Sequence, residues 1–407
     1  MFRKIIFINI LSILITLVLN NTVNTILIVG LFVNLIAYSL RNPQNILKVK
    51  ASHVIVFPIY LLITLLIGLL YTKDLNQGFN VLTLNIPLAL PFLIYRANIL
   101  DSKDFEKIIV FFSIFLVFFV SFFIFKQIEI DNITTTVYKL NSLFATEIIH
   151  PSYLTIYMIF SLLILYELDF KNHNKYLIFG LMLLLLTFIV LLSSKLVLII
   201  AIYFSLKLFF KFNKLQFYNK LSIISILSLT LLIFIIFPSK VKQDINNYYN
   251  LLFKKQKAVD IYTYKKMEVG TPTAYWNKVN RIIIWRNSID VIKENLPFGV
   301  GTGDYIDALN KMYEKNNESH HLYERNLNSH NQFLDFLIKY GIVGFLIFSI
   351  ILAKLLFEGV TQNNKNKIIF IAVFFFFAIG ENYMSRQWGV VFFSIILPLV
   401  YINNKQS

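Results

Sequence analysis

Long uncharged apolar runs constrain this chain more than any other feature. Residues 108–125 read IIVFFSIFLVFFVSFFIF and residues 176–192 read YLIFGLMLLLLTFIVLL, without a charged side chain in either. An α-helix needs roughly 17 to 25 apolar residues to cross the hydrocarbon core of a bilayer. Apolar residues make up 57% of the 407 residues and charged residues only 15%. The chain is therefore predicted to be an all-α integral membrane protein rather than a set of soluble domains.

Twelve segments are long and apolar enough to be predicted as transmembrane helices. They lie at residues 5–19, 23–40, 54–71, 81–95, 108–125, 153–168, 176–192, 195–210, 221–237, 342–357, 367–381 and 388–402. The first run follows Arg3 and Lys4, as in a signal peptide, but it has no small-x-small cleavage site and another apolar run follows directly. It is therefore interpreted as the first helix.

The basic residues carry a formal net charge of +16 and lie mostly in short loops between apolar runs. Loops with many basic residues alternate along the chain with loops that have few. By the positive-inside rule, this alternation predicts that both termini are cytoplasmic. This distribution accounts for the charge without a nucleic-acid partner. There is no cysteine, which excludes disulfides, thiolate catalysis and cysteine-ligated metals.

One polar segment, residues 238–330, is too long to be a simple connection. The predicted organisation has nine transmembrane helices in residues 1–237, a large periplasmic loop in 238–330 and three transmembrane helices in 331–407. Within the loop, residues 280–299 show an amphipathic helical pattern that Pro297 and Gly299 end. Loops of this length in compact folds are usually functional or disordered, so we expect the chemistry here.

Arginine is scarce, and two of the seven arginines lie in the amphipathic pattern of the loop. Arg281 and Trp285 are four residues apart and share a helix face, whereas Arg286 lies about 140° from Arg281. A guanidinium grips phosphate or carboxylate through two hydrogen bonds. We expect one of these arginines to face a site; the alternative is an interfacial helix with two solvated or headgroup-binding arginines.

His330 lies where an apolar helix is predicted to begin, with Asn328 or Ser329 expected as the N-cap. The positive end of the helix dipole would keep the imidazole neutral and able to accept a proton. That is the property of a general base. The alternative is that His330 is a polar residue at the membrane interface.

Three other features of the sequence are candidate sites. Lys195 lies at the outer end of a predicted span, where it either extends to the interface or contributes to an anion site. Gly299, Gly301 and Gly303 do not match the spacing of nucleotide-binding loops and predict a tight turn. The adjacent histidines at 320–321 lack further ligands at metal-binding spacing. No metal and no cofactor are therefore expected.

The motif that begins at His330 resembles a signature of bacterial envelope enzymes. His330 and Asn331 are followed by nine residues and then by Gly341-Ile-Val-Gly344. This is similar to the pattern of the O-antigen ligase and Wzy polymerase superfamily of membrane glycosyltransferases. Residues 280–305 resemble the Arg-x-x-x-Leu/Trp helix of that family and its Pro-x-x-Gly-x-Gly-x-Gly turn. The resemblance covers residues 145–345 as ordered motifs.

The resemblance implies a GT-C-like enzyme that transfers a glycan from undecaprenyl pyrophosphate on the outer face of the inner membrane, without metal or nucleotide sugar. His330 matches the loop histidine that activates the acceptor hydroxyl. Arg281 matches the arginine that binds pyrophosphate, with Arg286 as a further candidate. Lys195 stands where family members usually have a second arginine. His150, in HPSY, matches a stretch before a middle helix.

The resemblance leaves the acceptor open. A ligase would transfer the glycan to lipid A core, a Wzy-type polymerase to a growing carrier-linked chain, and a protein O-oligosaccharyltransferase to a protein. A non-enzymatic transporter of lipid-linked glycans is the alternative from another class. Transporters carry ionisable residues deep within their spans, and the predicted spans here are almost free of charge. Membrane lipids are expected partners of every alternative.

Overall fold

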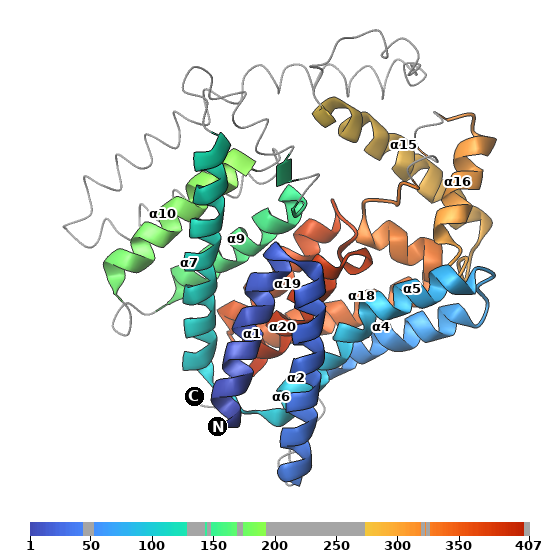
Figure 1. Ribbon diagram of the computed structural model, residues 1–407. Coiled ribbons are helices and arrows are strands. Elements are labelled where there is room, and N and C mark those ends of the chain that lie inside the picture. Colours follow the sequence, from blue (N-terminus) through green and yellow to red (C-terminus); the bar gives the residue numbers. More distant parts are fainter. Residues whose placement is uncertain are drawn as a thin grey trace.

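The computed structural model describes residues 1–43, 53–127, 143–144, 148–168, 174–192, 273–318, 322 and 326–402 (Figure 1). Within these ranges the regular structure is entirely helical. The α-helices are α1 (Phe2–Leu19), α2 (Asn21–Arg41), α4 (His53–Leu69), α5 (Leu75–Asn85), α6 (Leu90–Ala97), α7 (Ser102–Gln127), α9 (Pro151–Glu167), α10 (Lys175–Leu192), α15 (Thr273–Glu294), α16 (Tyr305–Lys315), α18 (Gln332–Thr361), α19 (Lys365–Ala378) and α20 (Gln387–Ile402). Two 3₁₀ turns, η1 (Ile86–Ala89) and η2 (Tyr383–Ser385), connect some of them.

Five segments of the described part are long and apolar enough to cross a membrane: Phe2–Leu19, Asn21–Arg41, Leu75–Ala97, Ser102–Lys126 and Gln332–Thr361. Four shorter apolar helices accompany them, at Val54–Leu69, Pro151–Glu167, Lys175–Ile189 and Gln387–Tyr401. The prediction of an all-helical membrane protein is confirmed at this level. The spans predicted at 195–210 and 221–237 lie outside the described residues, so the count of twelve stays a prediction.

Three predicted spans differ from the helices observed. The run at 81–95 is not one regular helix, because Pro87 and Pro91 each remove a backbone donor and η1 separates α5 from α6. The run at 342–357 begins directly after a non-helical residue, Gly341, inside α18, as predicted, but its helix continues to Thr361. The run predicted at 367–381 corresponds to helix α19, which already ends at Ala378 and leaves Glu381 in a loop.

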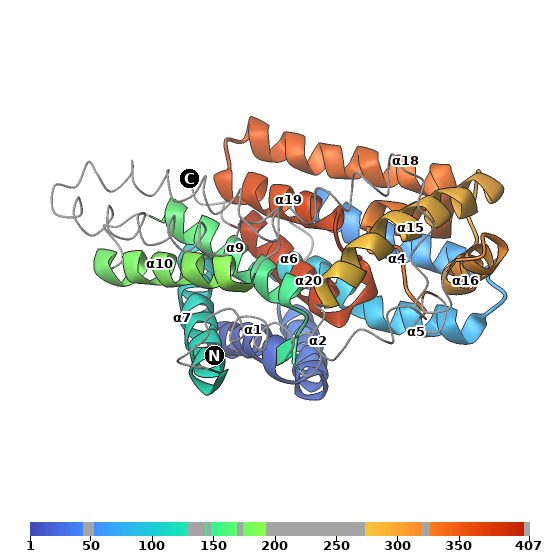
Figure 2. The same ribbon diagram turned by 90° about the horizontal axis from the view of Figure 1, so that it is seen from above.

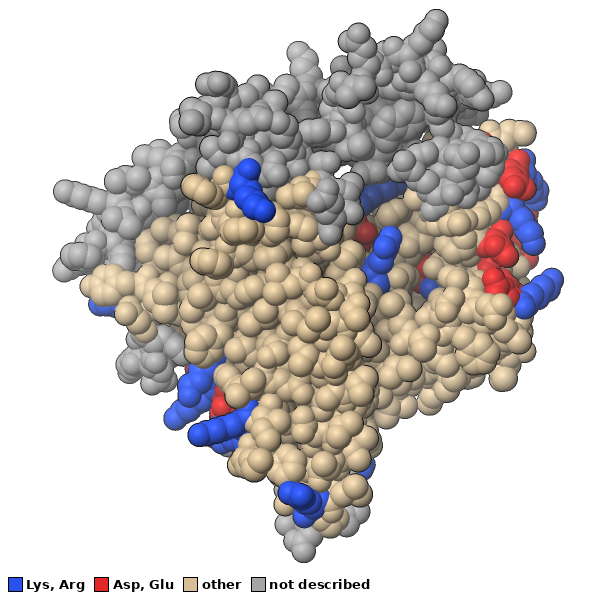
Figure 3. All heavy atoms as spheres, in the orientation of Figure 1, with Lys and Arg blue, Asp and Glu red and all other residues tan. Residues whose placement is uncertain are grey.

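The surface of α1 and α2 has the composition expected next to lipid. Large apolar side chains are exposed along both helices, including Ile8, Ile26, Val33 and Leu40. Figure 3 shows a broad face almost free of charge, with charged side chains gathered at its ends and along the edge. In water such a surface would be unfavourable, so these residues indicate contact with lipid or another apolar partner.

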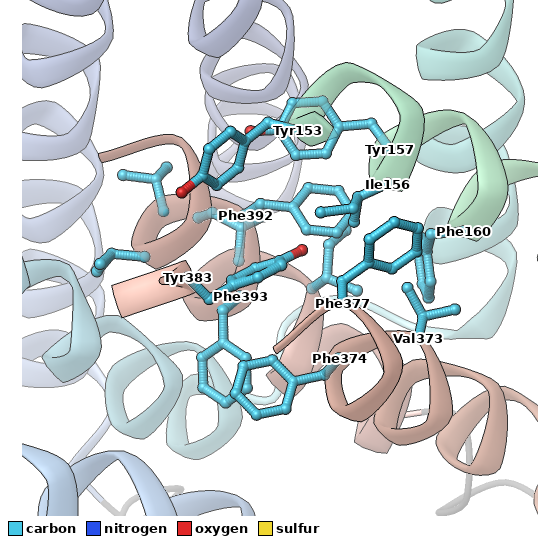
Figure 4. Packing of buried hydrophobic residues seen from close by; sticks show 14 of the residues in the cluster. Tyr153, Ile156, Tyr157, Phe160, Val373, Phe374, Phe377, Tyr383, Phe392 and Phe393 are labelled. Atoms are coloured by element: carbon cyan, nitrogen blue, oxygen red, sulfur yellow. The ribbon is translucent and has the colours of Figure 1, made fainter. Parts of the chain in front are cut away.

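Aromatic side chains from α9, α19 and α20 form the buried centre of the described part (Figure 4). Tyr157 of α9 stacks at 4.5 Å between ring centroids on Phe392 of α20, and its hydroxyl donates to the carbonyl of Trp388 at 2.8 Å. Phe374 of α19 lies 5.0 Å from Phe393. In the view of Figure 2, α19 lies beside both α18 and α9. This packing fixes the loop between α19 and α20 next to the beginnings of α9 and α18.

Candidate active site

A break at Gly341 joins the start of α18 to the loop that follows α15. Gly341 has φ +62°, a conformation open to glycine, and it interrupts the hydrogen-bond pattern of α18. The carbonyls of Ile338 and Lys339 instead accept hydrogen bonds from the amides of Val300 and Gly301, both at 2.9 Å. The loop that contains the glycine repeat is thereby fixed to the helix that follows His330.

The other motif glycines also lie where backbones approach closely. Gly299 has φ +78°, and a Cβ added there would lie 2.6 Å from the amide nitrogen of Gly341. Gly303 donates its amide to Thr72 Oγ1 at 3.0 Å. Gly344 accepts a hydrogen bond from the Tyr60 hydroxyl at 2.6 Å. The repeat forms a turn packed between α4 and α18.

The N-cap of α18 is Asn331, and the prediction of Asn328 or Ser329 as the cap was wrong. The Asn331 Oδ1 atom accepts from two amides of the first turn, at 2.9 and 3.1 Å. Asn328 instead accepts from the backbone amide of His330 at 3.1 Å. His330 precedes the cap in a left-handed conformation, with φ +44°. A non-glycine residue in this region is uncommon and is associated with functional sites.

The Glu381 carboxylate lies at the centre of a cluster drawn from three distant segments. Its Oε1 atom accepts from Arg281 Nη2 at 2.9 Å and from Ser152 Oγ at 3.1 Å. Its Oε2 atom lies 3.5 Å from His330 Nδ1, an ion-pair distance rather than a short hydrogen bond. The Glu381 side chain is only 10% exposed.

Burial alone raises the pKa of Glu381, but the contact with His330 and the charge of Arg281 outweigh burial and lower the pKa to about 2. The carboxylate is therefore ionised at neutral pH. Its negative charge stabilises a positive charge on either partner. This environment differs from the one predicted for His330, in which the helix dipole alone acted on the ring.

His150 lies beside the same carboxylate, as the N-cap of α9. Its Nδ1 atom accepts a long hydrogen bond, 3.4 Å, from the amide of Ser152. Burial lowers the pKa of His150, and the nearby charge of Glu381 opposes this only in part. His150 is therefore expected to be neutral at pH 7 and to orient Ser152 rather than to carry charge.

The two arginines of α15 point in different directions, as their spacing predicts. Arg281 reaches Glu381, and Trp285 on the same helix face donates its indole N–H to the carbonyl of Ser329 at 3.0 Å. Arg286 instead pairs with Glu318 and is 64% exposed. Arg281 is therefore the arginine of this helix that contacts the cluster.

A buried polar network lies beneath the His330 loop. The Asn382 Oδ1 atom accepts from the amide of Asn331 at 2.6 Å and from Ser329 Oγ at 3.1 Å. Its Nδ2 group donates to Asp335 at 3.1 Å, and Asp335 accepts from Lys339 Nζ at 2.7 Å. Because buried polar groups must be paired, this network fixes the position of the loop.

Sequence reasoning missed Glu381 and Asn382. Both fall at or just past the end of an apolar run and were assigned to the span and its edge. The available signal was an ionisable residue at the end of a span, directly after the helix-breaking Gly380, because such residues are often functional. Lys195 and the histidines at 320–321 lie outside the described residues. Within the described part, no group of three His, Cys, Asp or Glu residues is arranged to hold a metal ion.

The fold and site define a helical membrane protein with a charged cluster at the ends of its apolar helices. The model of the O-antigen ligase family matches residues 179–349. This match over residues 179–349 confirms the resemblance to the O-antigen ligase and Wzy family. A search of curated proteins found no match. Arg281 and His330 lie inside the matched region, whereas His150 and Glu381 lie outside it.

The family consists of glycosyltransferase-like ligases and polymerases. The match supports an enzyme of this general kind, and the apolar helices indicate a membrane protein. The match implies, in general terms, a lipid-linked glycan and an acceptor as partners.

Proposed function

We propose that the protein transfers a glycan from undecaprenyl pyrophosphate to an acceptor on the outer face of the cytoplasmic membrane. The observation that carries the proposal is the convergence of Arg281, His330 and Ser152 on Glu381. A group that can bind phosphate and a group that can accept a proton therefore both contact the same carboxylate. Such a pair suits a reaction in which an acceptor hydroxyl displaces a pyrophosphate.

His330 is the proposed general base. Its Nδ1 atom faces Glu381, so a proton on Nδ1 is oriented by the carboxylate and the lone pair of Nε2 is free to accept another. The side chain is 30% exposed, so a substrate hydroxyl can reach the ring. Carboxylate–imidazole pairs in other enzymes orient the base and stabilise the imidazolium in the same way.

In the proposed step the acceptor oxygen forms a bond to the anomeric carbon of the donor sugar. The bond from that carbon to the phosphate oxygen breaks, and its electron pair leaves with undecaprenyl pyrophosphate. The hydroxyl proton passes to Nε2 of His330, and the imidazolium pairs with Glu381. The protein contributes positioning, proton transfer and electrostatic stabilisation.

Arg281 is the proposed ligand of the pyrophosphate. One Nη2 donor is engaged by Glu381, but the side chain is 36% exposed and its other N–H groups can donate to phosphate oxygens. Arg286 is engaged by Glu318, which makes it the weaker candidate. Lys195 is proposed as a second cation at the pyrophosphate. No metal ion takes part in the proposed reaction.

The membrane arrangement belongs to the same proposal. Both termini are cytoplasmic, and residues 238–330 form a periplasmic loop between nine preceding and three following transmembrane helices. His330 and Arg281 then meet at the outer boundary of the inner membrane, where the pyrophosphate of a flipped lipid carrier lies. This arrangement is GT-C-like.

The test is transfer of a defined glycan from undecaprenyl pyrophosphate by purified protein in detergent with EDTA present. Lipid A core and a carrier-linked repeat unit are offered separately. Product on lipid A core identifies a metal-independent ligase, and longer carrier-linked chains identify a polymerase. If neither product forms, both forms of the proposal fail and a protein acceptor or the transporter alternative replaces them.

A further inference from the structure

A polar cavity of about 370 Å³ lies between the beginnings of α5 and α16 and two loop segments that border the His330 cluster. This volume falls in the range of about 300 to 1,000 Å³ that is usual for small-molecule sites. Its lining includes the side-chain amides of Gln77 and Asn328, the phenol of Tyr305, the carboxylate of Asp307, the hydroxyl of Ser385 and the guanidinium of Arg386.

The two loop segments connect the cavity directly to the proposed active site. Asn328 lines the cavity and accepts the backbone hydrogen bond of His330 at 3.1 Å. Ser385 and Arg386 line it from the same short segment that carries Glu381. A ligand in the cavity would therefore contact the two loop segments that position the base and its carboxylate partner.

Several polar groups of the lining are not engaged elsewhere in the described part of the chain. Ser385 Oγ is buried and has no hydrogen-bond partner there. Arg386 and Asp307 are both exposed, and neither forms an ion pair with another described residue. A buried hydroxyl without a partner is unfavourable, which points to a ligand that supplies one.

The chemistry of the lining distinguishes between ligand classes. A site for pyrophosphate alone would concentrate cations, whereas this lining combines Arg386 with the carboxylates of Asp74 and Asp307. Sugar hydroxyls both donate and accept hydrogen bonds, so they can satisfy a guanidinium, a carboxylate and an amide together. One face of the buried Tyr305 ring is covered by Lys339 Nζ at 3.9 Å, which fixes the ring in the wall.

We propose that this cavity binds a sugar residue of a glycan substrate, through Arg386, Asp307 and the hydroxyl of Ser385, and holds it beside His330. The inference rests on the proposed glycosyl transfer, because that reaction is the reason for taking the ligand to be a glycan. The sugar comes either from the acceptor or from the donor repeat unit, and both present the same hydroxyl chemistry.

Binding of two oligosaccharides without lipid or pyrophosphate tests the inference. The probes are the repeat-unit oligosaccharide released from the carrier lipid and the core oligosaccharide of the lipid A acceptor, titrated against purified full-length protein by saturation-transfer NMR. We expect one probe to bind and Arg386→Ala to raise its Kd about tenfold or more, because hydrogen bonds to charged groups are lost. Asp307→Asn, at an exposed position, should also raise the Kd of that probe.

Lys311→Ala is the matched control, because it removes an exposed positive charge from α16 outside the cavity lining. It should bind as wild type. The probe that binds identifies the source of the sugar. Unchanged binding in both Arg386→Ala and Asp307→Asn, or no binding of either probe to wild type, would overturn the inference.

The two proposals fail separately. Transfer by wild type without binding at the cavity would remove the sugar subsite and leave the enzyme assignment standing. Binding that depends on Arg386, in a protein that transfers nothing, would support the sugar subsite and remove the transferase.

Discussion

Replacing Glu381 by Gln should destabilise the folded protein, because it removes the negative charge shared by Arg281 and His330. An ordinary glutamate has a pKa near 4.5, and that of Glu381 is lowered to about 2. Since one pKa unit corresponds to about 1.4 kcal/mol, the fold favours the charged carboxylate by about 3 kcal/mol. Solvent around Arg281 screens part of this interaction, so we expect Glu381→Gln to lower the free energy of unfolding by about 2 kcal/mol.

The pH dependence of this loss has a definite sign. Because the pKa of Glu381 is lower in the folded than in the unfolded state, its stabilisation is fully present above the unfolded-state pKa of about 4.5. It is lost progressively as the pH falls towards 2. The difference in stability between wild type and Glu381→Gln should therefore reach its full size at pH 7 and be clearly smaller at pH 3.

Thermal unfolding of purified protein in detergent, followed by tryptophan fluorescence at both pH values, measures this difference. Glu294→Gln is the control, because Glu294 pairs with Lys315 on the exposed surface and its loss should leave the melting midpoint nearly unchanged. Equal midpoints for wild type and Glu381→Gln at pH 7, or a difference that persists unchanged at pH 3, would refute the reasoning.

Three further predictions follow from single contacts. Arg281→Ala should lose more transfer activity than Arg286→Ala, because only Arg281 contacts the cluster; kinetics showing the reverse order would mean that the wrong arginine was assigned. Asn382→Leu should destabilise the fold by about 2 kcal/mol or more, measured by thermal unfolding, since it leaves buried partners unpaired. Gly341→Ala should lower the melting midpoint, because alanine is strained at φ +62° and its Cβ would overlap the carbonyl of Pro297; an unchanged midpoint would argue against this backbone geometry.

The parts of the fold that could be predicted from sequence depend on local pattern. Helices α1, α2 and α7 follow uncharged runs whose length and composition are sufficient evidence. The spacing from His330 to Gly344 predicted the match to the O-antigen ligase family, and the helical spacing of Arg281 and Arg286 predicted that they lie on different faces of the helix. Each of these inferences needs only neighbouring residues.

The centre of the site depends on contacts between distant segments and was not predictable in this way. Glu381 is one hundred residues from Arg281 and 229 from Ser152. Its local sequence marks it as an ionisable residue at the end of a span but gives no indication of these partners. The N-cap of α18 was misassigned for a related reason, because Asn328, Ser329 and Asn331 are all suitable caps and tertiary contacts with Asn382 decide between them.

The most direct test of the account is a kinetic comparison of four proteins: wild type, His330→Ala, Glu381→Gln and the double variant. All four are assayed for glycan transfer from undecaprenyl pyrophosphate at equal protein levels. We expect His330→Ala to be nearly inactive and Glu381→Gln to lose about a hundredfold or more, since general-base catalysis contributes about 10² to 10⁴. Because Glu381 acts through His330, the double variant should be no slower than His330→Ala. Full activity in His330→Ala would contradict the central claim.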